Sequence, residues 1–176
     1  MLERGVDEPI LTTARLTFRP FTPDDYPVVA ALHGDPEVQR FIGGVWDQPT
    51  LRGRFDSYLA DQAAHGLAKW RMDETGVGFV GAAGFSLDAR TGRADLGYTF
   101  VRSAWGRGLA NEAARALTDW LFSNTEVEVM TACAAVDHAV SRRVLEALGM
   151  SPDGEGDRHG VRCAFYRLAR AGWTAS

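Results

Sequence analysis

Apolar residues recur along the chain with two spacings, and each spacing predicts a kind of element. Alternating or short continuous apolar runs, such as Leu16 and Phe18, predict strands at about 15–19, 67–72, 77–86, 96–101, 127–135 and 162–168. Apolar residues three and four apart predict short helices after Thr22 and Asp35, and longer helices at about 49–65, 109–122 and 138–148. This order predicts an α/β (α+β) fold with an antiparallel meander followed by one βαβ crossover.

The same pattern sets the expected limits of the domain. Residues 1–12 lack a clear period and are predicted to be a flexible lead-in, and residues 171–176 a C-terminal tail. Residues 154–160 are polar and glycine-rich and are predicted to form a loop. No repeat or long linker divides residues 13–170, which we expect to form a single domain.

Composition narrows the class of protein. At 45% hydrophobic and 24% charged residues, the chain can build an ordinary globular core. Its net charge of −4 does not favour a nucleic-acid partner. Cys133 and Cys163 lack metal-site spacing and are expected to be free thiols in a reducing, cytoplasmic compartment. The acidic N-terminus does not resemble a signal peptide, and no apolar run is long enough to suggest a membrane span.

The stretch from Ala94 to Ala116 predicts a strand, a glycine-bearing loop and the start of a helix. Glycines allow close backbone approach, and a helix start directs unpaired N–H groups and a positive dipole at the same place. Such a site suits a phosphate or pyrophosphate. A flexible turn that binds nothing is the alternative interpretation.

A second glycine pattern is misleading. Gly76, Gly78 and Gly81 spell G-x-G-x-x-G, the dinucleotide-binding pattern. That pattern requires a strand before it and a helix that opens at it. Here it begins in a predicted hairpin turn and continues along a strand, so we reject a dinucleotide site and, with it, a nicotinamide-dependent oxidoreductase.

The stretch Asp137–Met150 brings three polar side chains to one helix start. His138, Ser141 and Arg142 fall within one helical turn and can share a side of the helix. Taken alone, each has an ordinary explanation: Arg142 can pair with Glu146 at the surface, and the other two can be helix-surface residues.

Five motifs in order carry a family resemblance. They are R-L-T-F-R-P-F-T-P-D-D, D-P-E-V-Q-R-F-I-G, A-D-L-G-Y, W-G-R-G-L-A-N-E-A and S-R-R-V-L-E-A-L-G-M, between about Thr13 and Leu168. With them the chain resembles the GNAT superfamily of acetyl-coenzyme A-dependent N-acetyltransferases. It is most similar to the RimJ/RimL-like branch, which acetylates ribosomal-protein N-termini.

The resemblance implies the GNAT fold: a mixed, mostly antiparallel sheet with flanking helices and a central parallel strand pair that splays apart. It implies acetyl-coenzyme A as co-substrate and no metal. It also implies a set of cofactor-binding residues, namely Phe100, Val101, Arg102, Trp105, Gly106, Arg107, Gly108, Leu109, Ala110, Asn111, His138, Ser141 and Arg142. Two positions depart from the usual motifs, since Trp105 replaces Gln or Arg and His138 replaces Asn.

The resemblance also suggests catalytic groups. Asp95 stands where the branch usually has Glu and is the candidate base, acting through a water; a structural strand-edge carboxylate is the alternative. Ser141 is the candidate donor to the leaving thiolate, because Leu145 replaces a tyrosine common in the family. A backbone N–H near Val101 is expected to polarise the thioester carbonyl.

The acceptor is expected to be a primary amine, either a protein N-terminus or a small molecule. Phe41, Trp46, Tyr58 and Trp70 are the candidate acceptor-binding residues, although the last three could be core instead. A homodimer is also left open. The alternative function is a non-catalytic acyl-coenzyme A sensor on the same fold.

Overall fold

A computed structural model describes residues 8–175, and these residues form one eight-stranded sheet in the order β1-β2-β3-β4-β5-β6-β8-β7. The strands are β1 (Leu11–Thr12), β2 (Leu16–Arg19), β3 (Lys69–Glu74), β4 (Gly78–Asp88), β5 (Arg93–Phe100), β6 (Val129–Ala135), β7 (Ser151–Arg158) and β8 (Val161–Ala169). The α-helices are α1 (Tyr26–Gly34), α2 (Pro36–Gln39), α3 (Gln48–His65), α4 (Leu109–Asn124) and α5 (Ala139–Ala147).

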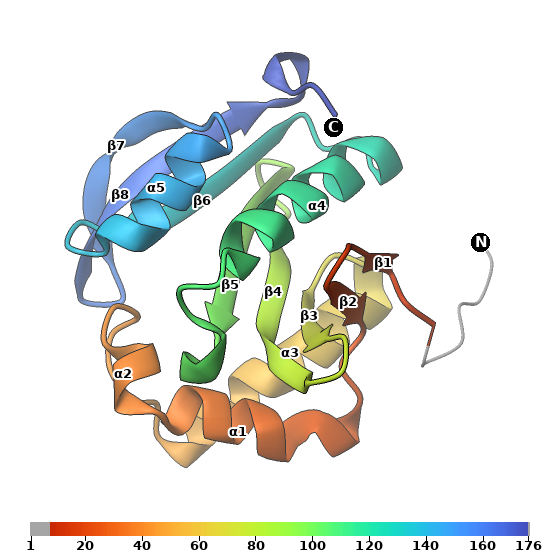
Figure 1. Cartoon of the computed structure of the whole chain (residues 1–176). Coiled ribbons are helices and arrows are strands. Elements are labelled where there is room, and N and C mark those ends of the chain that lie inside the picture. Colours follow the sequence, from red (N-terminus) through yellow and green to blue (C-terminus); the bar gives the residue numbers. More distant parts are fainter. Residues whose placement is uncertain (1–7, 176) are drawn as a thin grey trace.

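Helices cover both faces of the sheet. Helices α4 and α5 lie side by side on one face, and α3 lies behind the other (Figure 1). The larger core cluster joins α4 to side chains such as Trp70, Leu96 and Phe100, while a smaller cluster joins α1 and α3 through Phe21 and Phe55. Nowhere in residues 8–175 is a helix long and apolar enough to cross a membrane.

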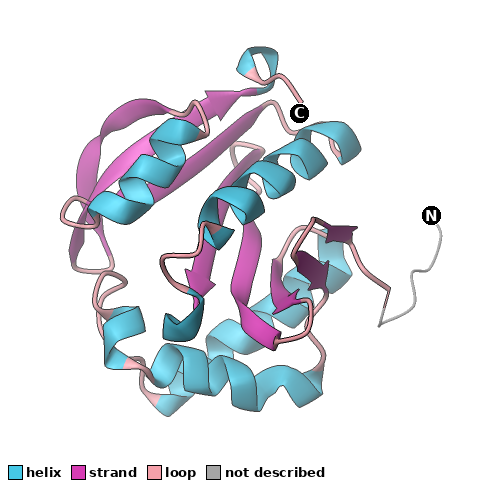
Figure 2. Cartoon of the chain, viewed as in Figure 1, coloured by secondary structure: helices cyan, strands magenta, loops and turns pink. Residues whose placement is uncertain are grey.

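The strand order confirms the predicted fold class. Every neighbouring pair of strands in the described sheet is antiparallel except β5 and β6, which are parallel and are joined by the crossover through α4. Figure 2 shows these two strands spreading apart toward their carboxyl ends. The splayed parallel pair expected from the resemblance is therefore present.

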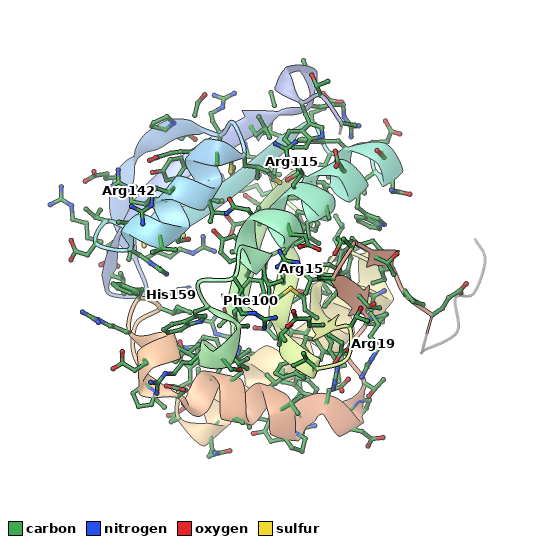
Figure 3. All side chains as sticks on the ribbon, in the orientation of Figure 1. Arg15, Arg19, Phe100, Arg115, Arg142 and His159 are labelled. Atoms are coloured by element: carbon green, nitrogen blue, oxygen red, sulfur yellow. The ribbon has the colours of Figure 1, made fainter. Side chains whose placement is uncertain are left out.

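Three local expectations differ from the structure. Residues 154–160 are not a loop: most of them belong to β7, an exposed edge strand whose polar, glycine-containing sequence hides the strand period. Its hairpin turn, with His159, lies beside α2 (Figure 3).

Both predicted ends of the domain also need correction. The last two residues of the predicted lead-in, Leu11–Thr12, form a strand that pairs with β2; residues 1–7 lie outside the described residues. The predicted tail contains Trp173, whose indole packs on the core and donates to Asp119 on α4 at 2.9 Å.

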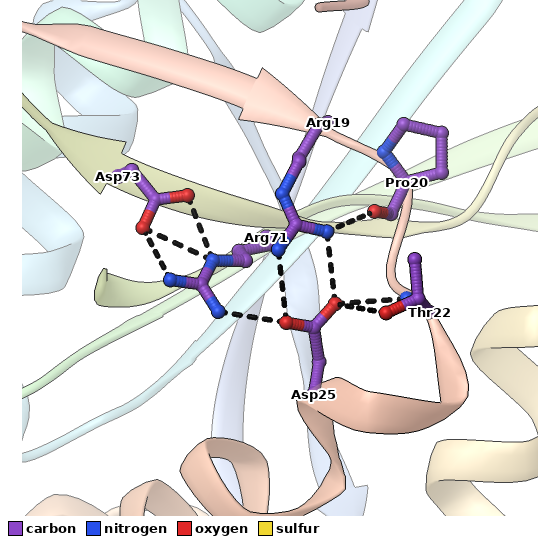
Figure 4. Close-up of polar contacts among 6 residues, drawn as sticks. All are labelled: Arg19, Pro20, Thr22, Asp25, Arg71 and Asp73. Carbon is purple, nitrogen blue, oxygen red and sulfur yellow. Dashed lines mark hydrogen bonds and ion pairs between the residues drawn. The ribbon is translucent and has the colours of Figure 1, made fainter. Parts of the chain in front are cut away.

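One buried carboxylate joins the helical layer to the sheet. Asp25 lies just before α1 and receives hydrogen bonds from Arg19 on β2 and Arg71 on β3, while Asp73 binds the other side of Arg71 (Figure 4). Its carboxylate also accepts the Thr22 backbone N–H at 2.8 Å. Burial opposes ionisation of Asp25, but the hydrogen bonds from Arg19, Thr22 and Arg71 outweigh it and lower its pKa from 3.8 to about 2.

We expect Asp25→Asn to lower the free energy of unfolding by roughly 3 kcal/mol at pH 7, since it leaves two guanidinium groups without their shared carboxylate. The folded pKa lies below the unfolded value, so the stabilisation is complete above pH 4 and is lost as the pH falls toward 2. Urea denaturation of both proteins between pH 7 and pH 2 measures this difference. Asp73→Asn is the matched control, because the Asp73 side chain is 25% exposed against 6% for Asp25. Equal losses in the two variants, or a loss that does not change with pH, would contradict this role for Asp25.

Candidate active site

The central feature of the site is the place where two parallel strands stop pairing. The pairing of β5 with β6 runs from Ala94 opposite Met130 to Leu96 opposite Ala132 and ends there. Strand β5 continues to Phe100 and stays paired with β4 along this length. The remainder of β5 therefore presents one backbone edge to β4 and the other to the space between the diverging strands.

Alternate residues of β5 direct their backbone groups to opposite edges. The Val101 N–H donates to the Val80 carbonyl at 2.9 Å, so Val101 and every second residue before it point toward β4. The Val101 N–H is therefore already bonded across the sheet, so the predicted N–H near Val101 that polarises a thioester carbonyl has to come from a neighbouring residue. Tyr98 and Phe100 point the opposite way, into the divergence, and their N–H groups are the ones placed to hold a bound molecule.

A glycine-bearing loop leads from this point into α4. Gly106 and Gly108 have φ of +70° and +77°, a left-handed conformation that strongly favours glycine. Gly108 is the N-cap of α4, and no side chain caps the helix there. The first intrahelical bond runs from Glu112 to the Gly108 carbonyl, which leaves the N–H groups of Leu109, Ala110 and Asn111 without helical partners. This uncapped positive end fits a pyrophosphate.

Side chains from segments distant in the sequence anchor the loop. Arg107 makes two hydrogen bonds to Glu74, which is 6% exposed at the end of β3. Arg15 donates to the Arg107 carbonyl at 2.9 Å and pairs with Glu112 in the first turn of α4. The Arg107 side chain, assigned to the cofactor from the sequence, holds the loop on β3 in this structure.

Trp105 closes the start of the loop. Its indole Nε1 donates to the Phe100 carbonyl at 3.0 Å, while 46% of the residue stays exposed. This bond satisfies the Phe100 carbonyl, which has no strand partner on the side of the divergence. Figure 3 places Phe100 close to the start of α4. Arg102 lies between them, exposed at the start of the short 3₁₀ turn Arg102–Ala104.

A pair of hydroxyl groups lies on the α5 side of the divergence. The Tyr98 hydroxyl and the Ser141 Oγ are 3.0 Å apart, and either can donate to the other. Burial raises the pKa of Tyr98 from 10 to about 12, although the Ser141 bond opposes the rise, so the phenol keeps its proton at neutral pH. Ser141 is the predicted donor, but Tyr98 was missed. The sequence does contain a signal for Tyr98: it ends the A-D-L-G-Y motif, and the strand period of two places it on the same face as Leu96, toward α5.

The other two predicted residues at the start of α5 have different surroundings. His138 is the N-cap and stacks on Phe41 with ring centroids 4.2 Å apart, which joins a predicted cofactor residue to a predicted acceptor residue. Burial lowers the pKa of His138. Arg142 donates to the Tyr166 hydroxyl at 3.1 Å and lies 3.9 Å from Glu146, as the surface-pair interpretation expected. In this structure the Arg142 side chain therefore contacts Tyr166 on β8 and Glu146 on its own helix, α5.

Asp95 lies on the opposite face of β5 from Tyr98. Its carboxylate accepts a hydrogen bond from Arg158 on β7 at 2.8 Å and from the Thr131 hydroxyl on β6 at 3.1 Å. Arg158 also donates to the Cys133 thiol at 3.1 Å. The carboxylate thus lies at the mouth of the divergence, where a permanent cation holds it in place.

The predicted acceptor residues separate into core and surface positions. Trp70 is fully buried against Trp120, with its Nε1 bonded to Gln62 at 2.7 Å, so the core interpretation applies and Trp70 leaves the acceptor site. Trp46 is half-buried and stacks on His33. Tyr58 is half-buried and stacks on Phe21. With Phe41, which borders a hollow of about 460 Å³ beside Asp137 and Arg162, these two remain candidates for the acceptor wall.

We expect Gly108→Val to weaken binding of coenzyme A by about 10-fold or more, because a β-branched residue disfavours the left-handed conformation that aims the α4 N–H groups. Isothermal calorimetry measures the affinity. Gly66→Val is the matched control, since Gly66 has a φ of +71° at the C-terminal end of α3. Both variants should lose similar stability, while only Gly108→Val loses affinity. Unchanged affinity in folded Gly108→Val protein would remove this loop from the site.

Comparison with known proteins agrees with this geometry. The family model described as an acetyltransferase (GNAT) domain matches residues 15–151. An uncharacterized N-acetyltransferase, p20 of Bacillus licheniformis, is 28% identical over 82% of this chain and 83% of its own. An acetyltransferase of Agrobacterium tumefaciens superposes with a TM-score of 0.81 at 27% identity, over 96% of this chain and 98% of that one.

A solved structure from the ribosomal branch shares the fold at lower identity. RimL, a ribosomal L7/L12 α-N-protein acetyltransferase in complex with coenzyme A, superposes with a TM-score of 0.80 at 15% identity, over 94% of this chain and 99% of that one. The family match extends from β2 to the start of β7 and includes the divergence, the loop and both flanking helices. The chain therefore belongs to the GNAT acetyltransferase family.

Proposed function

We propose that this acetyltransferase moves the acetyl group of acetyl-coenzyme A to a primary amine by direct attack in a ternary complex. The observation that carries the proposal is the end of β5–β6 pairing at Leu96, directly beside the uncapped start of α4. Acetyl-coenzyme A supplies an activated acyl group on a sulfur leaving group. The protein contributes binding, orientation and proton transfer.

Binding is divided between the loop and the strand edge. The N–H groups at the start of α4 are placed for the pyrophosphate, and the backbone edge of Tyr98 and Phe100 for the extended arm that follows it. Both sets of donors are held in place before binding, by Arg107 and Arg15 on the loop and by β4 on the strand. Donors that are already oriented lose less conformational entropy when a ligand binds.

The hydroxyl pair is the proposed proton source for the leaving thiolate. Tyr98 and Ser141 share a hydrogen bond on the α5 side, where the divergence opens toward the helix layer. A bond donated to sulfur strengthens as negative charge develops there, so it stabilises the transition state more than the ground state. The high pKa of Tyr98 keeps the proton available at every physiological pH.

Asp95 is the proposed proton acceptor on the other face. Its ion pair with Arg158 holds the carboxylate in place. An α-amine with a pKa near 7.8 is roughly a quarter neutral at pH 7.4, against about a thousandth for an ordinary lysine, so an α-amine needs less help from a base. We therefore favour a protein N-terminus or another α-amine as the acceptor, and a place for this chain in the RimJ/RimL-like branch.

Turnover with acetyl-coenzyme A against a panel of amines tests the proposal. The panel contains peptides with free N-termini, the same peptides with blocked N-termini and an internal lysine, a polyamine and an aminoglycoside. Release of coenzyme A only with free N-termini supports the proposed acceptor. Binding of coenzyme A without release in any reaction would favour the non-catalytic sensor.

We expect Ser141→Ala and Tyr98→Phe each to lower kcat by about 10-fold to 100-fold, a loss of roughly 1.4–2.7 kcal/mol of transition-state stabilisation. The KM for acetyl-coenzyme A should change much less. Because the hydroxyl groups bond to each other, the double variant should lose less than the product of the single losses. A raised cofactor KM with unchanged kcat would instead assign the pair to cofactor positioning.

For Asp95→Asn we expect kcat to fall by about 10²-fold to 10⁴-fold near neutral pH, with the loss shrinking as the pH rises and the amine deprotonates by itself. Rate profiles between pH 6 and 9.5 measure the effect. Arg158→Met is the matched control, since it breaks the same ion pair but keeps the carboxylate. A loss that is constant with pH, and equal in both variants, would assign Asp95 to structure.

A further inference from the structure

The side chain of Lys69 follows a path across the sheet that glycines leave open. Lys69 begins β3, Gly84 is its register partner on β4, and Gly97 is the partner of Gly84 on β5. Because neither glycine has a side chain, the Lys69 side chain extends across β4 and its Nζ lies over Gly97 on β5. A Cβ added to Gly97 would lie 2.9 Å from this Nζ. Nζ donates to the Gly84 carbonyl at 2.9 Å.

This path ends at the mouth of the divergence. Gly97 is the first residue of β5 beyond the last pair with β6, Leu96 opposite Ala132. Nζ also lies 3.5 Å from the backbone carbonyl of Asp95, on the face opposite the Tyr98–Ser141 pair. The ammonium group therefore occupies the position from which an acceptor amine would approach a thioester held between β5 and β6.

The groups around the amine come from four elements. They are Asp95 on β5, Cys133 on β6, Arg158 on β7 and Asp61 on α3. Lys69 is the only lysine in the sequence, which otherwise uses arginine for its cations. The chain therefore has a single lysine amine, and it lies at this place instead of among other lysines on the surface.

We propose that Lys69 is a self-acetylation site, at which Nζ takes the acetyl group of acetyl-coenzyme A bound to the same protein. The inference rests on the proposed function. The Nζ lone pair forms a bond to the acetyl carbonyl carbon, the carbon–sulfur bond breaks, and the products are Nε-acetyl-lysine and coenzyme A. The proton lost from nitrogen goes to Asp95 or water, and the thiolate receives one from the Tyr98–Ser141 pair.

The surroundings favour the neutral amine that this step requires. Burial lowers the pKa of Lys69 from 10.5 to about 8; Asp95 and Cys133 oppose the change, and Arg158 adds to it. At pH 7.4 about a fifth of the Lys69 amine is then neutral, against about a thousandth for an ordinary lysine. The rate of self-acetylation should rise about 10-fold between pH 7 and 9, most of it below pH 8.5.

Intact-mass measurement and peptide mapping of the full chain test the proposal, after incubation with acetyl-coenzyme A and no amine. We expect one acetyl group on Lys69 in the wild-type protein and none at this position in Lys69→Arg. The control carries Lys69→Arg together with Arg52→Lys, which moves the lone lysine to an α3 position whose side chain is 54% exposed. Its lysine should react at least about 10-fold more slowly at pH 7.4.

Three results would overturn the inference, and parallel assays on the amine panel separate them from failure of the proposed function. Turnover of amines without acetyl on Lys69, or with acetyl only on the chain's α-amino group, overturns the self-acetylation site alone. Equal rates at positions 52 and 69 assign the modification to uncatalysed reaction with the thioester. Absence of both amine turnover and self-acetylation in protein that binds coenzyme A overturns the proposed function and the inference with it.

Discussion

The site depends on one constraint, the separation of β5 from β6 beyond Leu96. A strand that stays paired on one side and loses its partner on the other must satisfy its exposed backbone groups in some other way. Here the Trp105 indole satisfies the Phe100 carbonyl, and β4 holds the alternate residues through bonds such as that from Val101 to Val80. What remains is a rigid edge with donors facing an opening, which is the arrangement that an extended thioester-bearing arm requires.

The separation also gives the sheet two chemically different faces at one point. On the α5 face lie two neutral hydroxyl groups, Tyr98 and Ser141, which can donate a proton but carry no charge. On the other face lie Asp95, Arg158 and Lys69, which are charged or readily become so. A leaving sulfur and an attacking amine have opposite requirements, since one gains a proton and the other loses one. Because successive side chains of a β-strand point to opposite faces, the proton-donating hydroxyl groups and the charged groups lie on opposite sides of the same short segment of β5.

Much of this arrangement could be read from the sequence because the chain's local signals agree with its fold. The alternation around Leu96, the glycines before α4 and the order of elements predicted the parallel pair and the loop. The sequence could not show which side chains distant from each other in the chain form hydrogen bonds and ion pairs. Nothing local to Arg107 indicates that it pairs with Glu74, 33 residues earlier, and nothing near Asp95 points to Arg158 on a polar edge strand that itself looked like a loop.

The errors share a physical cause. Which N–H near Val101 faces the divergence could not be predicted, because the edge depends on register with β4, and a shift of one residue reverses every backbone group. Trp70 looked like an acceptor residue because aromatic side chains serve both cores and pockets, and only packing against Trp120 separates the two. Tyr98 is absent from the predicted site because its partner, Ser141, is 43 residues away in the sequence and lies on a different element.

Lys69 also reports the conditions that an acceptor amine would meet. Burial at the mouth of the divergence, with Arg158 close by, is enough to lower a lysine pKa from 10.5 to about 8. An acceptor amine that approaches the same place loses part of its hydration and faces the same guanidinium, so its pKa falls in the same direction. For an α-amine that starts near 7.8, a fall in pKa raises the neutral fraction at neutral pH. The place thus raises the fraction of amine that can attack, and Asp95 remains the proposed acceptor of the proton that leaves nitrogen as the new bond forms.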